Sequence, residues 1–153
     1  MNLNHEPIII GSDHAAYPLK QIIKTWLINN NFQVEDKGTD SIESVDYPDY
    51  GIKVASLISK GQFSRGILLC GTGLGMSMVA NRFAHVRGAL CNNLFSAKMS
   101  RQHNDANLLI MGGRVIGDIL ALEIIKTWLE TPFEGGRHQQ RLDKFDKFDN
   151  LLD

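Results

Sequence analysis

The residues most able to do chemistry are Cys70 and the glycine-rich loop that follows it, CGTGLG at residues 70–75. Gly71, Gly73 and Gly75 alternate, which lets the backbone turn tightly and expose several N–H groups. A helical segment follows, and N–H groups at a helix start can hold an anion such as a phosphate or an enediolate. The same donors favour a thiolate, so Cys70 could be a nucleophile or a general base. A close-packed turn with a buried, unreactive thiol is the structural alternative.

Both common nucleotide motifs are missing from this loop. Its glycine spacing differs from the dinucleotide fingerprint G-x-G-x-x-G, and no lysine stands where a P-loop would need one. The anion that this loop would bind is therefore not identified by a nucleotide motif.

Three further groups of polar residues could contribute to a site. Asp13 and His14 follow an apolar run and would face a crevice there, although Asp13 could simply cap a helix. His103 precedes another apolar run, and on its own it is weak evidence. Arg137 and Arg141 are four residues apart, so on a helix they share a face and could clamp a phosphate. A solvated basic face is the alternative for the arginines.

The sequence offers no metal site. Its histidines stand at positions 5, 14, 85, 103 and 138, and none pairs with another histidine or a cysteine at a usual ligand spacing. We therefore expect chemistry without a bound metal ion.

Short apolar runs alternate with segments of helical periodicity along the chain. Strands are predicted at residues 8–10, 32–36, 66–70, 87–91 and 107–111. Helices are predicted over residues 19–27, around 54–58 after a turn at Pro48, from the loop to about 82, at 96–102 and at 116–129. This alternation predicts an α/β fold, a three-layer α/β/α sandwich of Rossmann-like type on a five-stranded parallel sheet.

In such sheets ligands bind outside the carboxyl ends of the strands, where the strand order reverses. That rule selects the loops after the first and third predicted strands, residues 11–14 and 71–75. The cysteine loop and the Asp13-His14 pair are thus expected to lie together.

Composition limits the remaining possibilities. The 153 residues, 17.1 kDa, fit a single domain over 1–153, with about 143–153 as a polar tail that could be a frayed helix. A net charge of −1 argues against a nucleic-acid partner. The apolar runs are far shorter than a membrane helix, and residues 1–7 lack the apolar core of a signal peptide. Two cysteines fit a reducing compartment, so we expect a cytoplasmic protein.

Taken together, these motifs resemble the B-type ribose-5-phosphate isomerases, which share a family with the subunits of galactose-6-phosphate isomerase. The matching stretches are GSDHA (11–15), DYPD (46–49), GILLCGTGLGMS (66–77), ANR (80–82), RQHNDAN (101–107), GGR (112–114) and GGRH (135–138). The resemblance extends over nearly the whole chain, from about residue 8 to residue 141.

The resemblance implies reversible isomerisation of ribose 5-phosphate and ribulose 5-phosphate, a step of the pentose phosphate pathway, without metal or cofactor. It implies that His103, with Asp13 opposite, opens the sugar ring. Cys70 would then take a proton from carbon to give an enediolate, and Thr72 would help to move a proton. Some relatives have serine at the cysteine position and use a glutamate further on. This loop has no glutamate, which supports Cys70 as the base.

The resemblance also implies the substrate contacts and the assembly. The expected binding residues are His14, Tyr47, Gly71, Gly73, Gly75, Asn104, Arg137 and Arg141. Arg137, Arg141 and His14 would bind the phosphate, Asn104 and Tyr47 would orient hydroxyl groups, and the loop glycines would stabilise the negative oxygen. The implied assembly is a homodimer or a dimer of dimers with sites at the subunit interface.

Two alternatives remain at the level of the sequence. The substrate could be a six-carbon sugar phosphate, such as allose or galactose 6-phosphate, because pocket length cannot be measured from sequence. The chain could also be a non-enzymatic domain that binds a phospho-ligand. That hypothesis uses the anion loop and the arginines but leaves Cys70 and His103 without a role.

Overall fold

The computed structural model describes residues 6–151. Residues 1–5, most of the segment assessed for a signal peptide, lie outside the described residues, as do residues 152–153 of the expected tail. Within the described part the core is a five-stranded parallel sheet in the order β2-β1-β3-β5-β4. The strands are β1 (Ile8–Ser12), β2 (Val34–Asp36), β3 (Arg65–Cys70), β4 (Gly88–Leu90) and β5 (Leu108–Gly112). The predicted fold class is confirmed.

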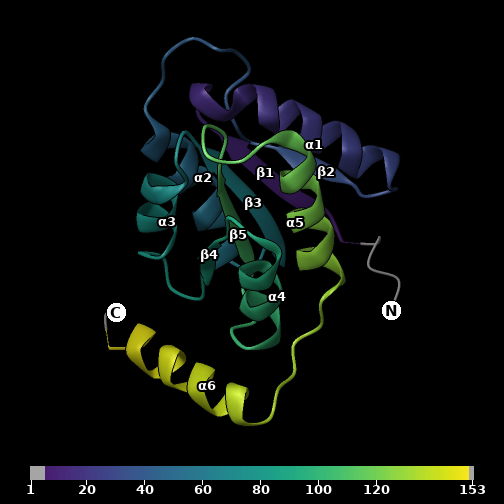
Figure 1. The fold of residues 1–153 in the computed structure, drawn as a ribbon. Helices are drawn as coiled ribbons and strands as arrows, with labels where there is room; N and C mark the ends of the chain where they lie inside the picture. The colour runs from purple at the N-terminus through teal and green to yellow at the C-terminus, as the bar shows by residue number, and fades with distance from the viewer. Residues whose placement is uncertain (1–5, 152–153) are drawn as a thin grey trace.

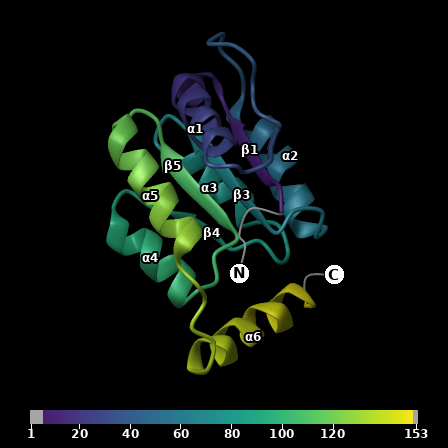
Figure 2. The ribbon, with the colours of Figure 1, turned by 90° about the vertical axis from the view of Figure 1, so that its right-hand side faces the viewer.

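Helices cover both faces of this sheet (Figures 1 and 2). The helices of the described residues are η1 (His14–Ala16), α1 (Tyr17–Asn29), α2 (Tyr47–Ser59), α3 (Leu74–Ala80), α4 (Leu94–Gln102), α5 (Asp118–Glu130) and α6 (Arg137–Asp149). One apolar cluster joins the sheet to α1, α4 and α5, and a second joins it to α2 and α3. Together the two clusters make the three layers of the sandwich.

The strand sequences explain why both faces are covered. Every residue of β1 and β5 is buried, as are residues 66–70 of β3, so neither face of these strands can be left to water. On α1, Leu19, Ile23 and Leu27 recur every four residues and are buried against the sheet. The period-four pattern in the sequence therefore identified the inward face of α1 correctly.

Because all strands point the same way, the sheet has a carboxyl edge and an amino edge. In the sheet, β2 lies on one side of β1 and β3 lies on the other. The strand order therefore reverses between β1 and β3, and the carboxyl ends of these two strands flank that point. This confirms that the loops after β1 and β3 are neighbours. At the opposite, amino edge, α6 crosses below the sheet (Figure 1).

Two boundaries differ from the sequence prediction. Pro48 is not in a turn before α2 but in its first turn, where a helix needs no N–H donor from the proline. Residues 143–149, expected in a polar tail, belong to α6, in which His138 and Leu142 are buried. Two buried side chains four residues apart can hold one face of a helix even where most of its residues are charged.

Among residues 6–151, no helix combines the length and the apolar character needed to cross a membrane.

Candidate active site

Cys70 is the last residue of β3 and lies at the carboxyl edge, as predicted. Its side chain is buried, and the Gly73 N–H donates to Cys70 Sγ over 3.2 Å. A backbone donor directed at sulfur stabilises negative charge there. We expected the Gly73 N–H to face a substrate oxygen, whereas its partner in this structure is the sulfur itself. The loop thus directs a backbone N–H at the sulfur of Cys70.

The glycines of the loop are required by close contacts. Gly73 has φ +80°, and a Cβ there would lie 2.5 Å from Leu90 Cδ1. A Cβ at Gly75 would lie 2.5 Å from the ring of Tyr47. The absence of side chains lets the loop pass under Tyr47 and over the end of β5. Thr72 is exposed at the tip of the loop, where its Oγ1 accepts from the Leu74 N–H over 3.2 Å.

The segment after β1 supplies a carboxylate and an imidazole. Asp13 caps η1, its Oδ1 accepting from the Ala16 N–H at 3.2 Å, so the structural role that we considered for it is real. The Val45 N–H donates to His14 Nδ1 over 3.1 Å. That bond requires an unprotonated Nδ1, so neutral His14 carries its proton on Nε2. His14 therefore has an N–H available for another acceptor.

These segments enclose a pocket of about 360 Å³. Its lining residues are Asp13, His14, Ala15, Tyr47, Cys70, Gly71, Thr72, Gly75, Met78 and Arg114. Seven of them were selected from the sequence, and the structure brings these seven together. Gly73 is buried below the pocket instead of lining it.

Of the three lining residues that the sequence did not single out, Arg114 is the charged one. It follows β5, and its Cδ lies 3.5 Å from the position that a Cβ on Gly71 would take. Its guanidinium adds a permanent positive charge beside the anion loop. The signal was present in the GGR stretch at 112–114, but only the adjacency of β3 and β5 shows that Arg114 reaches the pocket of Cys70.

His103, Asn104, Arg137 and Arg141 do not line this pocket. His103 ends α4, and Asn104 follows in the turn that leads into β5 at the amino edge. Arg137 and Arg141 are exposed on the first turns of α6. Within one chain the candidate residues thus form a group at each edge of the sheet.

The amino-edge residues are connected by two histidines. The rings of His103 and His138 stack with their centroids 4.2 Å apart and an interplanar angle of 10°. Burial lowers the pKa of His138, and electrostatic repulsion from the neighbouring His103 and Arg137 side chains lowers it further. This stack joins the end of α4 to the start of α6, so His103 and the two arginines belong to one cluster.

Glu134 also approaches this cluster, so three possible metal ligands lie together: the closest atoms of His103, Glu134 and His138 are within 4.8 Å of one another. Nothing in the spacing of His103 and His138 along the chain predicts that these histidines meet. A metal ion lies near the plane of each imidazole that binds it, and nearly parallel stacked rings do not share a plane. The geometry therefore fits an aromatic stack better than a metal centre.

Taken as a whole, a parallel α/β sandwich with a pocket of polar side chains, a buried thiol and a glycine-rich loop at its carboxyl edge is typical of an α/β enzyme. A family model described as Ribose/Galactose Isomerase matches residues 8–145. The chain belongs to this family.

Individual relatives agree with this assignment. The chain is 47% identical over 136 residues to ribose-5-phosphate isomerase B of Escherichia coli K12, covering 89% of this chain and 91% of the relative. The solved structure of Clostridium thermocellum ribose-5-phosphate isomerase B matches with a TM-score of 0.93 at 48% identity, covering 96% and 99% of the two chains. That of the Mycoplasma genitalium enzyme with bound ribulose-5-phosphate matches with a TM-score of 0.92 at 38% identity, covering 96% and 98%.

Proposed function

We propose that this protein is an aldose–ketose isomerase that interconverts ribose 5-phosphate and ribulose 5-phosphate through an enediolate. The observation that carries the proposal is Cys70, whose sulfur accepts the Gly73 N–H at the base of a pocket lined by Asp13, His14 and Thr72. Membership of the ribose/galactose isomerase family and the 47% identity to an enzyme named for this activity support the same conclusion.

In the reaction proposed, His103 and Asp13 open the furanose ring: one takes the proton of the C1 hydroxyl and the other gives a proton to the ring oxygen. The bond between C1 and the ring oxygen breaks, which leaves the C1 aldehyde and the C4 hydroxyl. Cys70 thiolate then removes the proton from C2, and the electron pair forms the C1–C2 double bond of an enediolate with charge on O1. Thr72 transfers a proton between O2 and O1, and the Cys70 thiol returns its proton to C1. Each group thus handles one proton within hydrogen-bonding range of the reacting atoms.

The substrate is held by groups of complementary charge and polarity. Arg137, Arg141 and His14 bind the phosphate, and Arg114 adds to the positive charge at the pocket. Asn104 and Tyr47 orient the sugar hydroxyls. The loop N–H groups of Gly71 and Gly75 face the developing negative oxygen, where one such donor is worth roughly 3–4 kcal/mol.

The complete site is formed between two copies of the chain. His103 and Cys70 are at opposite edges of one sheet, so one copy supplies its carboxyl edge and the other its amino edge. Support comes from apolar side chains exposed around the carboxyl edge: Leu74, Met78, Leu94, Phe95 and Val115. Large apolar side chains grouped in this way are typical of a surface that another protein covers. The assembly is therefore a homodimer or a dimer of such dimers.

The activity is tested with the purified chain and ribose 5-phosphate in a coupled assay for ribulose 5-phosphate, without added metal. Allose and galactose 6-phosphate are assayed in parallel, and faster turnover of either would change the substrate assigned. In heavy water, a protein that only binds the sugar phosphate would introduce no deuterium at C1 or C2. The absence of both turnover and exchange would refute the proposal.

The shared site is tested by mixing two inactive variants, Cys70→Ala and His103→Ala. If each site draws Cys70 from one chain and His103 from the other, a mixed dimer retains one intact site. Equal mixing should then restore about a quarter of wild-type activity. Failure to recover activity after subunit exchange, shown by native mass spectrometry, would place both residues of a site in the same chain.

We also propose a cytoplasmic location. Both cysteines are free in the structure, and the mechanism requires Cys70 to remain a thiol. Cell fractionation followed by immunoblotting tests this directly.

A further inference from the structure

His103 and Asn104 lie in the turn between α4 and β5, so neither residue is held by the hydrogen bonds of a strand or by the interior of a helix. His103 is the C-cap of α4, and β5 begins at Leu108. Asp105 within the turn has φ +44°, a left-handed conformation that non-glycine residues rarely adopt. The shape of this turn must therefore be secured by contacts outside its own backbone.

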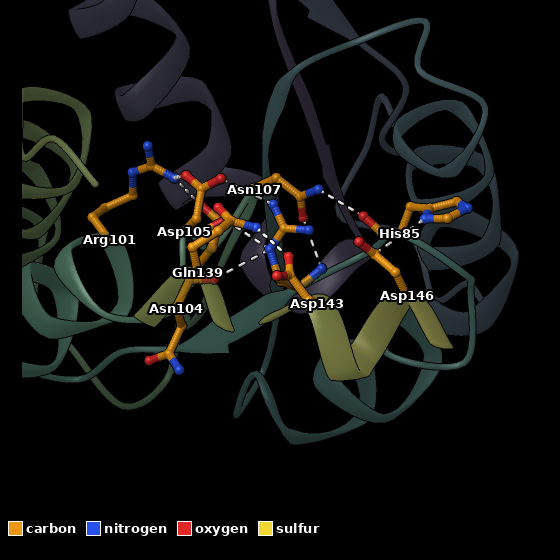
Figure 3. Close-up of polar contacts among 10 residues, drawn as sticks. His85, Arg101, Asn104, Asp105, Asn107, Gln139, Asp143 and Asp146 are labelled. Atoms are coloured by element: carbon orange, nitrogen blue, oxygen red, sulfur yellow. Dashed lines mark hydrogen bonds and ion pairs between the residues drawn. The ribbon is translucent and has the colours of Figure 1, made fainter. Parts of the chain in front are cut away.

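Two arginines hold the carboxylate of Asp105, and Figure 3 shows the contact with Arg101. Arg101 Nη1, from the last turn of α4, donates to Asp105 Oδ1 at 2.8 Å. Arg87 Nη2, from the residue before β4, donates to Asp105 Oδ2 at 3.2 Å. Each carboxylate oxygen thus has its own guanidinium partner, and all three side chains are partly buried. Ion pairs sheltered in this way are screened less by salt than exposed ones.

The same guanidinium groups also hold the backbone of the turn. Arg87 Nε donates to the carbonyl oxygens of Asn104 at 3.1 Å and Asp105 at 3.0 Å. Arg101 Nη1 donates to the carbonyl oxygen of Ala106 at 2.7 Å. Three successive carbonyl groups are therefore fixed by two side chains whose own positions depend on Asp105.

Asn107 connects this network to the neighbouring loop. Its Oδ1 accepts the Arg87 N–H at 2.8 Å, and its Nδ2 donates to the His85 carbonyl oxygen at 2.8 Å (Figure 3). The backbone of Arg87 is thereby held in place, as well as its side chain. Arg87 can then act as a fixed support for the turn.

We propose that Asp105, acting through Arg87 and Arg101, is a positioning residue for the opening of the sugar ring. It keeps the backbone next to His103 and Asn104 in one conformation, so both side chains reach the ring at a productive angle. This inference rests on the proposed isomerase function and on the ring-opening role of His103. Misplacement of a reacting group by about 1 Å can cost roughly 100-fold in rate.

Asp105→Asn tests the proposal, because it keeps the size of the side chain and removes its charge. Two rates are measured. Isomerisation of ribose 5-phosphate requires ring opening. Exchange of the C1 proton of ribulose 5-phosphate in heavy water does not, because the hydroxyl that would close a five-membered ring carries the phosphate.

The variant should lose roughly 10- to 100-fold in isomerisation and retain exchange within about twofold. Equal losses in both rates, or no loss in either, would refute the positioning role. A wild-type protein that shows neither rate would instead refute the proposed function, so the two failures are distinguishable.

Two further variants complete the experiment. Arg87→Lys keeps a positive charge opposite Asp105 but loses the Nε donor to two carbonyl groups, so it should show the same selective loss. If circular dichroism shows that Asp105→Asn does not fold, Arg87→Lys tests the positioning role in its place. The control is Glu35→Gln, in an exposed ion pair with Lys37 on the far side of the sheet, which should leave both rates unchanged.

Discussion

The two edges of the sheet hold their functional residues in different ways. At the carboxyl edge, Cys70, Asp13 and His14 each accept a hydrogen bond from a backbone N–H. At the amino edge, the turn that carries His103 is held by the side chains of Arg87 and Arg101. Backbone donors are positioned by the fold itself, whereas each side-chain donor can be removed by a single substitution.

The edges also differ in what they lack. The carboxyl edge has a pocket, a thiol and exposed apolar residues, but His103 lies elsewhere. The amino edge has two stacked imidazoles and two exposed arginines, but no nucleophile among its described candidates. In the proposed mechanism neither edge is a complete site by itself, so substitutions at each edge should affect different steps.

The largest effect is expected for Cys70→Ala at the carboxyl edge. Removing the base should lower kcat by roughly 10²–10⁴-fold, the usual contribution of a positioned acid–base group. Substrate binding should be retained, because Arg137 and Arg141 remain. Isothermal titration with ribose 5-phosphate and steady-state kinetics measure the two quantities.

Cys91→Ala is the matched control for this variant. Burial raises the pKa of Cys91 to about 11, so at neutral pH it is a thiol without a catalytic partner. Its removal should leave kcat unchanged. Iodoacetamide should inactivate the wild type through Cys70, with protection by bound sugar phosphate. A near-wild-type rate for Cys70→Ala would show that another residue is the base.

A smaller and more selective effect is expected for His103→Ala at the amino edge. Isomerisation of cyclic ribose 5-phosphate should fall by about 100-fold, at the lower end for a positioned acid or base. Deuterium exchange into open-chain ribulose 5-phosphate should fall much less, because the ring step is bypassed. Equal losses on the two substrates would show that His103 does not act in ring opening. They would also contradict the proposal that the two edges serve different steps.

Arg137→Ala and Arg141→Ala should act mainly on KM. Both side chains are exposed in one chain, so each loss should be near the lower limit for a charge pair, about 2 kcal/mol. Reaction of phosphate-free ribose should be insensitive to either change. Lys144→Ala, an exposed cation on the same helix, is the control. An unchanged KM in both arginine variants would place the phosphate elsewhere.

The smallest effect is expected for the ion pair of Lys20 with Asp36, which we call the anchor of the carboxyl edge. Buried Lys20 donates to Asp36 at 2.7 Å and to the Thr39 carbonyl oxygen at 2.7 Å. Burial raises the pKa of Asp36, but hydrogen bonds from Lys20, Gly38 and Lys24 outweigh burial, so the native pKa lies below the usual 3.8. The stabilisation is therefore complete well above pH 4 and is lost as the pH falls through the native pKa.

Asp36→Asn should accordingly lower the free energy of unfolding by about 1.5 kcal/mol at pH 7. The difference from the wild type should shrink as the pH falls below 4, because acid neutralises Asp36 in the wild type as well. Urea unfolding at several pH values measures this. A difference that is constant down to pH 2 would show that charge is not what stabilises the anchor.

Much of the carboxyl edge could be predicted from the sequence because its signals are local. The apolar run that ends at Cys70, the alternating glycines after it and the Asp13-His14 pair are each contiguous in the chain. Parallel strands end at the same edge and ligands bind where the strand order reverses, so the alternation of strands and helices predicted that these loops lie together. Arg114 could not be assigned in this way, because its place in the pocket depends on β5 lying beside β3.

The amino edge could not be predicted, because its contacts join distant residues through side chains. The stack of His103 on His138 spans 35 positions, and Asp105 meets Arg87 across 18. The sequence by itself determined the α/β class, the cysteine loop and the kinds of residue that could bind an anion or move a proton, because hydrophobic periodicity and glycine spacing act over a few residues. Only the tertiary structure decided which of these residues share a pocket, because strand order and the packing of α6 depend on burying apolar surface across the whole chain.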